Sequence, residues 1–192
     1  MGYDARGIMI QIKGSVLLSR LALVREIDPV KGLERVLARL SDFERAALQN
    51  PLASSWYPFD LGKRLDEAVV QVLGGGRTEF FEKLGAASAE NNLGGVHKKF
   101  LTVGDPHAFL AKAPTIYAFY YDEGRREYEK TGPTEGVLTT HDASTFSAPD
   151  CATVVGWHRR ALEMCGATKP RVVEEECRAR GGRVCRYRVS WS

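Results

Sequence analysis

The chain has 192 residues, of which 44% are hydrophobic, and its 27 basic and 24 acidic side chains leave a net charge of +3. This length is enough for one domain with a sizeable core, so residues 1–192 are predicted to form a single domain. The near-balanced charge argues against a strongly basic nucleic-acid-binding protein, and no apolar run is long enough to span a bilayer. Four cysteines without a signal-peptide pattern predict a cytoplasmic protein whose thiols stay reduced or bind a metal.

The first part of the chain is predicted to be helical after a short strand over residues 7–12. Apolar side chains recur at helical spacing in three segments, at residues 16–26, 30–40 and 61–72. Ser41 and Glu44 form a capping-box pattern, which predicts a further helix start. The glycines at 74–76 are interpreted as a helix–helix turn, because the Gly-Lys-Ser/Thr of a phosphate-binding loop does not follow them.

The middle of the chain contains two more predicted helix starts. Thr78 is expected to cap a helix that ends before a turn over residues 91–95. Helical structure is expected again over residues 96–101, and Asp105-Pro106 predicts one more helix start.

The C-terminal part of the chain is predicted to contain grouped strands. Two strands are expected over residues 126–130 and 136–141, then a helix over 151–165, then two further strands. Because the strands do not alternate strictly with helices, this order predicts an α+β domain. Its helical N-terminal part would pack on a short antiparallel sheet.

The last strand has a clear two-residue period. Cys185, Tyr187, Val189 and Trp191 fall on one face, and an Arg-Gly-Gly turn precedes them. A hairpin at this turn would bring Cys177 close to Cys185. Cys151 lies in the first turn of the preceding helix, where the helix dipole favours a thiolate.

Three cysteines and one carboxylate make a candidate metal site at the end of the chain. Cys151, Cys177 and Cys185 with Glu174 could hold a tetrahedral zinc ion. Glu174 and Cys177 are three residues apart, so a regular strand would point them to opposite faces and a bulge or bend is required between them. The alternative interpretation is that these are buried core cysteines beside a solvated glutamate.

This segment resembles the end of the 4-vinyl-reductase domain, in particular the zinc-containing sensory domain of phenol- and xylene-responsive transcriptional activators. The resemblance is carried by the pattern C-x22-E-x2-C-x7-C, with a Gly-aromatic pair at Gly156-Trp157 and a Gly-Gly pair at 181–182. It implies a structural zinc at Cys151, Glu174, Cys177 and Cys185, whereas Cys165 matches no ligand position. It also implies the mixed α/β fold of the superfamily that includes haem nitric-oxide-binding domains and a Golgi transport subunit, often as dimers. No convincing match to the haem-binding motif of the nitric-oxide sensors is found.

Aromatic side chains are dense between residues 100 and 121 and could line a small-molecule pocket. The alternative is ordinary core packing. The predicted ligand-binding residues are Trp56, Tyr57, Phe100, His107, Phe109, Tyr117, Tyr121 and Trp157.

The functional hypothesis is a non-enzymatic sensory domain that binds a small apolar or aromatic ligand and signals its occupancy to a protein partner. The four histidines are scattered and form no nucleophile or metal-hydrolase pattern, so no catalytic residue is assigned. The alternative is a dimeric adaptor without a ligand, and a closed apolar cavity would distinguish the two. The arginine-rich C-terminal third is interpreted as a solvated face paired with nearby acids, and neither nucleic-acid nor membrane binding is expected.

Overall fold

The computed structural model describes residues 9–95, 97–145 and 147–192. The N-terminal half is mainly helical, and capping explains where several helices begin. The Ser41 side chain and Glu44 form the predicted capping box, and the Asp105 side chain accepts a hydrogen bond from the Ala108 amide. The elements of this half are β1 Gln11–Lys13, α1 Gly14–Ile27, α2 Gly32–Leu37, α3 Asp42–Leu48, β2 Trp56–Pro58, α4 Phe59–Leu73, α5 Glu79–Gly94, η1 Lys98–Phe100, α6 Pro106–Leu110 and α7 Ala113–Tyr120.

The C-terminal half contains a four-stranded antiparallel sheet in the order β3-β4-β6-β5. Buried and exposed residues alternate along β6, with Cys185, Tyr187 and Val189 buried as the two-residue period predicts. The predicted α+β architecture with grouped strands is confirmed. The elements of this half are β3 Arg125–Gly132, β4 Glu135–His141, α8 Ala148–Met164, β5 Arg171–Glu176, η2 Arg178–Arg180 and β6 Cys185–Ser190.

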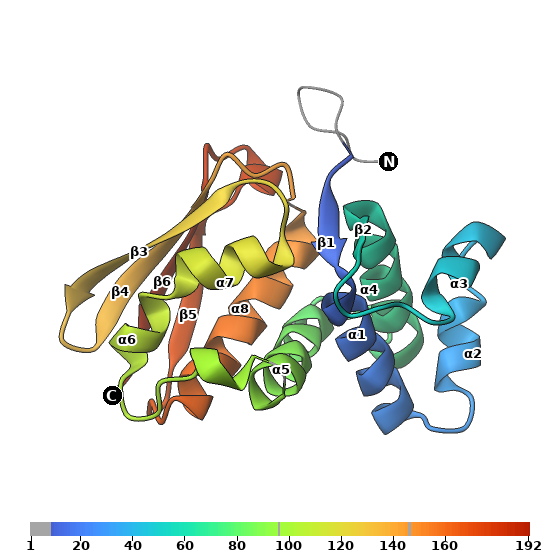
Figure 1. Ribbon diagram of the computed structural model, residues 1–192, viewed down its shortest axis with the longest axis horizontal. Helices are drawn as coiled ribbons and strands as arrows, with labels where there is room; N and C mark the ends of the chain where they lie inside the picture. Colours follow the sequence, from blue (N-terminus) through green and yellow to red (C-terminus); the bar gives the residue numbers. More distant parts are fainter. Residues whose placement is uncertain (1–8, 96, 146) are drawn as a thin grey trace.

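Helices α7 and α8 lie between the sheet and the N-terminal helices, and α5 packs on α8 (Figure 1). Two glycines allow α5 and α8 to approach at backbone distance. A Cβ atom at Gly85 would lie 1.9 Å from the Thr153 carbonyl oxygen, and one at Gly156 would lie 1.9 Å from that of Glu82. The close contact therefore depends on these glycines.

Two apolar cores fill the molecule. One lies among the N-terminal helices around Leu17, and the other lies between the sheet and α7 and α8 around Leu162. Val16 and Tyr121 contact both cores. The boundary between the two cores is where the main cavity of the molecule lies.

The sequence prediction missed the strand β2 and the helix α7, and three of its expectations differ from the structure. The predicted strand over residues 7–12 begins outside the described residues, and the continuous strand that forms is β1, Gln11–Lys13. Of the predicted helix over residues 96–101, residue 96 lies outside the described part and only the short η1 turn forms. The predicted turn over residues 91–95 is wrong: α5 runs to Gly94, because Asn91 and Asn92 bond within the helix, to the Ala87 carbonyl and the Ser88 hydroxyl.

Candidate ligand cavity and cysteine cluster

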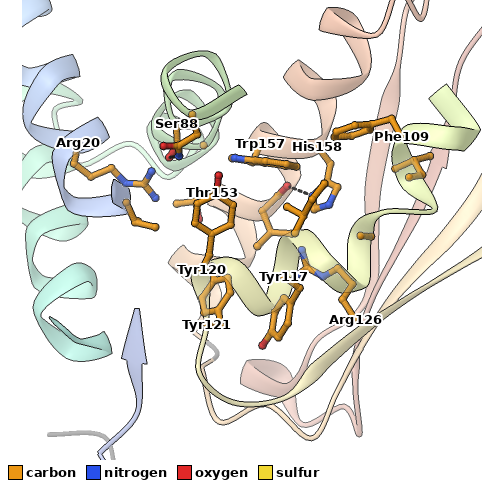
Figure 2. Close-up of a pocket in the computed structure, with 17 residues that line it drawn as sticks. Arg20, Ser88, Phe109, Tyr117, Tyr120, Tyr121, Arg126, Thr153, Trp157 and His158 are labelled. Atoms are coloured by element: carbon orange, nitrogen blue, oxygen red, sulfur yellow. Dashed lines mark hydrogen bonds between the residues drawn. The ribbon is translucent and has the colours of Figure 1, made fainter. Parts of the chain in front are cut away.

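The main cavity lies where α1, α5, α7, α8 and β3 meet, and its volume is ≈ 50 Å³. Such a volume holds about four water molecules, since each requires roughly 10–15 Å³. Its apolar walls come from several elements (Figure 2). They are Val16, Phe109, Leu110, Ala113, Ile116, Val154 and Trp157.

Two arginines line this cavity, and their surroundings differ. Arg20 on α1 is buried and pairs with Asp66, with Nε 2.8 Å from Oδ1 and Nη2 3.2 Å from Oδ2. Arg126 on β3 is also buried, and its Nε donates to the Thr140 hydroxyl at 2.9 Å. Its guanidinium lies 4.9 Å from the centre of the Tyr117 ring, a cation–π contact.

Tyr120 supplies an unusual polar group to the cavity wall. The residue is 6% exposed, and its hydroxyl is buried with no hydrogen-bond partner among the described residues. Burial raises the pKa of the phenol, so the group stays a neutral O–H. An unpaired buried hydroxyl costs about 1–3 kcal/mol, which a bound ligand could recover by hydrogen bonding.

His158 on α8 is the one histidine among the described residues that line the cavity. Its Nδ1 bonds to the carbonyl of Val154 one turn earlier, at 2.9 Å, so this nitrogen carries the proton. Burial, and then the charge of Arg126, lower the pKa of His158 to about 3. The imidazole is therefore neutral at physiological pH, and Nε2 is a hydrogen-bond acceptor.

The structure brings half of the predicted pocket residues together. Phe109, Tyr117, Tyr121 and Trp157 all line the cavity. Phe100 does not, because it packs in the core against His97 and Phe119.

The other three predicted pocket residues lie elsewhere. Trp56 and Tyr57 are on β2, where Trp56 covers the Lys13 ammonium and the Tyr57 hydroxyl accepts from the Leu52 amide. His107 bonds to the Tyr128 hydroxyl and, at 2.7 Å, to the Pro133 carbonyl. These residues were selected by residue type alone, and tertiary packing assigned them to other contacts.

Sequence reasoning missed the polar residues of the cavity, chiefly Arg20, Arg126, Tyr120 and His158. A weak signal existed for Arg20, since it is a charge within the apolar segment over residues 16–26. The sequence contains no such signal for Arg126, because this residue lies in a strand beside several exposed charged residues.

The predicted metal ligands converge at the start of α8. The ligand atoms of Cys151, Glu174, Cys177 and Cys185 all lie within 4.8 Å of one another. The Cys151 sulfur is 3.5 Å from that of Cys177 and 3.8 Å from that of Cys185. The predicted bulge is confirmed, because the register of β5 against β6 shifts between Glu174 and Glu176.

The cysteines of the cluster are buried, and hydrogen bonds shift the pKa of Cys185. The hydrogen bond from the Cys151 thiol lowers the pKa of Cys185 to about 6, and the Arg178 amide donates to the Cys185 sulfur at 3.4 Å. One carboxylate oxygen of Glu174 pairs with Arg180, while the other is buried without a hydrogen-bond partner in the described structure. Buried thiols facing an unpaired carboxylate oxygen form a donor set suited to a thiophilic cation.

Solved structures with the same fold are H-NOX proteins. The S. oneidensis H-NOX protein in its Fe(II)NO state is 11% identical, with a TM-score of 0.71 over 94% of this chain and 99% of that one. The unliganded Fe(II) protein from K. algicida is 12% identical, with a TM-score of 0.67 over 94% and 96% of the two chains. An oxygen-binding H-NOX domain related to soluble guanylate cyclases is 12% identical, with a TM-score of 0.66 over 94% and 95%. At this identity the likeness defines the fold: an H-NOX-like α+β domain.

The chain belongs to the family described as "Protein of unknown function (DUF2378)", whose model matches residues 30–192. No curated protein matches the sequence. Within the described ranges, no helix is both long and apolar enough to cross a membrane.

The expected cofactor, a structural zinc ion, is wrong. The solved structures with this fold are haem proteins, some described by their Fe(II) state and others by the distortion of their haem. The cysteine cluster exists, but its geometry does not assign zinc to it.

Haem itself does not fit the cavity of this chain. A volume that holds about four water molecules is far too small for a tetrapyrrole. Beside the cavity, α5 and α8 are in backbone contact at Gly85 and Thr153, so no slot for a planar macrocycle separates them.

Proposed function

We propose that this chain is a non-enzymatic sensory domain that binds a small, largely apolar molecule in the cavity between α1, α5, α7, α8 and β3. The observation that carries this proposal is an apolar cavity whose wall holds the buried hydroxyl of Tyr120, which has no hydrogen-bond partner in the described part of the chain. The H-NOX fold supports it, since solved proteins of that fold include one in its Fe(II)NO state and an oxygen-binding domain in its oxygen complex.

The absence of catalysis is part of this proposal. Among the described cavity residues, no hydroxyl or thiol is hydrogen-bonded to a histidine: Ser88 bonds Ser19 and Asn92, and Thr153 bonds a backbone carbonyl. His158 is neutral and bonded to its own helix, so an activated nucleophile is not assembled there.

Ligand binding would shift the populations of two packings of α5, α7 and α8, and a protein partner would read the difference. We further propose a homodimer, a cytoplasmic location and kinship with the 4-vinyl-reductase type of sensory domain. A dimeric adaptor without a ligand is the alternative, and the cavity favours the sensor.

Cavity binding is tested with a neutral aromatic probe, benzamide, by calorimetry on the full chain. We expect saturable binding, and we expect Ala113→Leu to abolish it, because Ala113 lines the cavity and a larger side chain would fill it. Ala38→Leu, at an exposed position on the far side of the N-terminal helices, is the control and should bind normally. Wild-type protein that binds no benzamide, or an Ala113→Leu variant with full affinity, would contradict the proposal.

We also propose that Cys151, Glu174, Cys177 and Cys185 form one metal-binding site, without assigning the ion or a structural role to it. The support is the 4.8 Å convergence of the four ligand atoms and the unpaired oxygen of Glu174. Elemental analysis of protein purified without chelators should find one metal ion per chain and identify it. Cys177→Ser should lose the ion while Cys165→Ser, at a buried cysteine outside the cluster, should retain it; a metal-free wild type would overturn the assignment.

A further inference from the structure

Arg126 is a buried cation on the wall of the cavity. It is 8% exposed, lies on β3 and points from the sheet toward the space between Tyr117 and His158 (Figure 2). The Nε bond to Thr140 and the ring contact with Tyr117 hold the guanidinium in position. Neither contact supplies a negative charge.

No carboxylate among the described residues lies within ion-pair distance of Arg126. Burial raises the pKa of the half-buried Asp150 to about 7, and the charge of Arg126 acts against this rise. The two side chains lie beyond ion-pair distance, and Asp150 Oδ1 is 3.5 Å from the Tyr121 hydroxyl. Arg20, on the opposite wall, has its own bidentate partner in Asp66. Of the two cavity arginines, therefore, one is neutralised by the protein and the other is not.

A buried guanidinium without a counter-ion is costly, and planar anions satisfy it best. A carboxylate matches the arginine fork and can accept two parallel hydrogen bonds. The remaining walls are apolar and aromatic, so the rest of the ligand must be apolar as well.

We infer that the cavity binds a small aromatic or apolar carboxylic acid as its anion, with the carboxylate held by Arg126 and the apolar body against Phe109 and Trp157. This inference rests on the proposed ligand-binding function and names the ligand class of the same site. The volume of ≈ 50 Å³ is smaller than the roughly 150 Å³ of an engineered apolar cavity that binds benzene. One ring with its carboxylate is therefore the upper limit of ligand size, and the walls must move apart to admit it.

The test compares benzoate with benzamide, which has nearly the same shape and no charge. Calorimetry on the wild-type chain should show benzoate binding about 10- to 100-fold more tightly, because hydrogen bonds to a charged group are the stronger ones. Arg126→Gln should lose this preference, so that benzoate no longer binds more tightly than benzamide. Arg125→Gln, at the exposed neighbour that pairs with Glu127 and Asp142, is the matched control and should keep the preference.

The melting temperature is a second measurement, which shows whether the Arg126→Gln variant is folded. Removing an uncompensated buried charge should leave the melting temperature of the unliganded Arg126→Gln chain equal to or above that of the wild type. Benzoate should raise the melting temperature of the wild type and of Arg125→Gln but not that of Arg126→Gln. If Arg126→Gln does not fold, Arg126→Leu provides the same comparison.

The outcomes separate the two proposals. Two results would contradict the proposal that Arg126 binds a carboxylate: equal affinity of benzoate and benzamide for the wild type, or a preference for benzoate that survives in Arg126→Gln. Neither result would contradict the proposed ligand binding in the cavity. If neither compound binds, the ligand-binding function fails together with the anchor.

Discussion

At the scale of single residues, two neighbouring tyrosines on α7 have opposite hydrogen-bonding states. The Tyr117 hydroxyl donates to the Glu123 carbonyl at 3.0 Å and lies 3.3 Å from the Thr145 hydroxyl, whereas the Tyr120 hydroxyl has no described partner. Tyr120→Phe should therefore stabilise the unliganded chain by about 1 kcal/mol, while Tyr117→Phe should destabilise it by about 1 kcal/mol. Urea unfolding measures both, and a loss of stability in Tyr120→Phe would contradict the unpaired state of its hydroxyl.

His158 makes the stability of the fold depend on pH. Its pKa is about 3 in the folded chain against about 6.5 when unfolded, so the unfolded chain binds more protons between these values and stability falls as the pH falls below about 6.5. From about pH 7.5 to about pH 5 this histidine should cost about 2 kcal/mol.

The variant His158→Leu removes this pH-dependent contribution to stability. It leaves no group of another element without its hydrogen-bond partner, because His158 Nδ1 bonds a carbonyl of its own helix. Urea unfolding at both pH values should show a pH-dependent loss about 2 kcal/mol smaller in the variant. The other histidines are present in both proteins, so their contributions to the pH dependence cancel in the comparison. Equal losses of stability in the wild type and the variant would show that His158 is not buried and neutral.

At the scale of elements, the α5–α8 contact joins the helical half to the sheet half. Gly156→Ala would place a methyl group 1.9 Å from the Glu82 carbonyl oxygen, so the two helices must separate. We expect a loss of about 1–3 kcal/mol, although alanine favours the helix intrinsically by about 1 kcal/mol. Gly94→Ala, in the same helix pair but with nothing within 4 Å of the new methyl group, is the control and should leave stability unchanged or slightly higher. A neutral Gly156→Ala variant would mean that the helices are not in backbone contact.

The elements also show where sequence reasoning succeeds. Caps and periodicity are local, so the capping box at Ser41, the helix start at Asp105 and the alternation along β6 were predicted correctly. The turn expected over residues 91–95 was wrong, because asparagine and glycine are typical of turns, yet side-chain bonds to the preceding helical turn keep both asparagines in α5.

At the scale of the whole molecule, the two cores meet at Val16 and Tyr121 and are joined by the α5–α8 contact. We expect them to unfold together. In a Trp56→Phe variant the remaining tryptophans, Trp157 and Trp191, report on the sheet half, while far-UV circular dichroism reports on all helices. The two urea midpoints should coincide, whereas separate midpoints would show that the halves are independent folding units.

By itself, the sequence determined the α+β class, several helix starts, the grouping of the C-terminal strands, and the set of side chains that meet at the cysteine cluster. These follow from short-range patterns and from the two-residue period of a strand, which holds wherever the strand lies. The polar wall of the cavity was decided only by the tertiary structure. Arg20 pairs with an acid on α4, whereas Arg126 has no acidic partner among the described residues. Nothing in the sequence around either arginine predicts this difference. The pairing of buried charges depends on which distant elements pack together. The packing of α1, α5, α7 and α8 around one cavity cannot be predicted from any local sequence pattern.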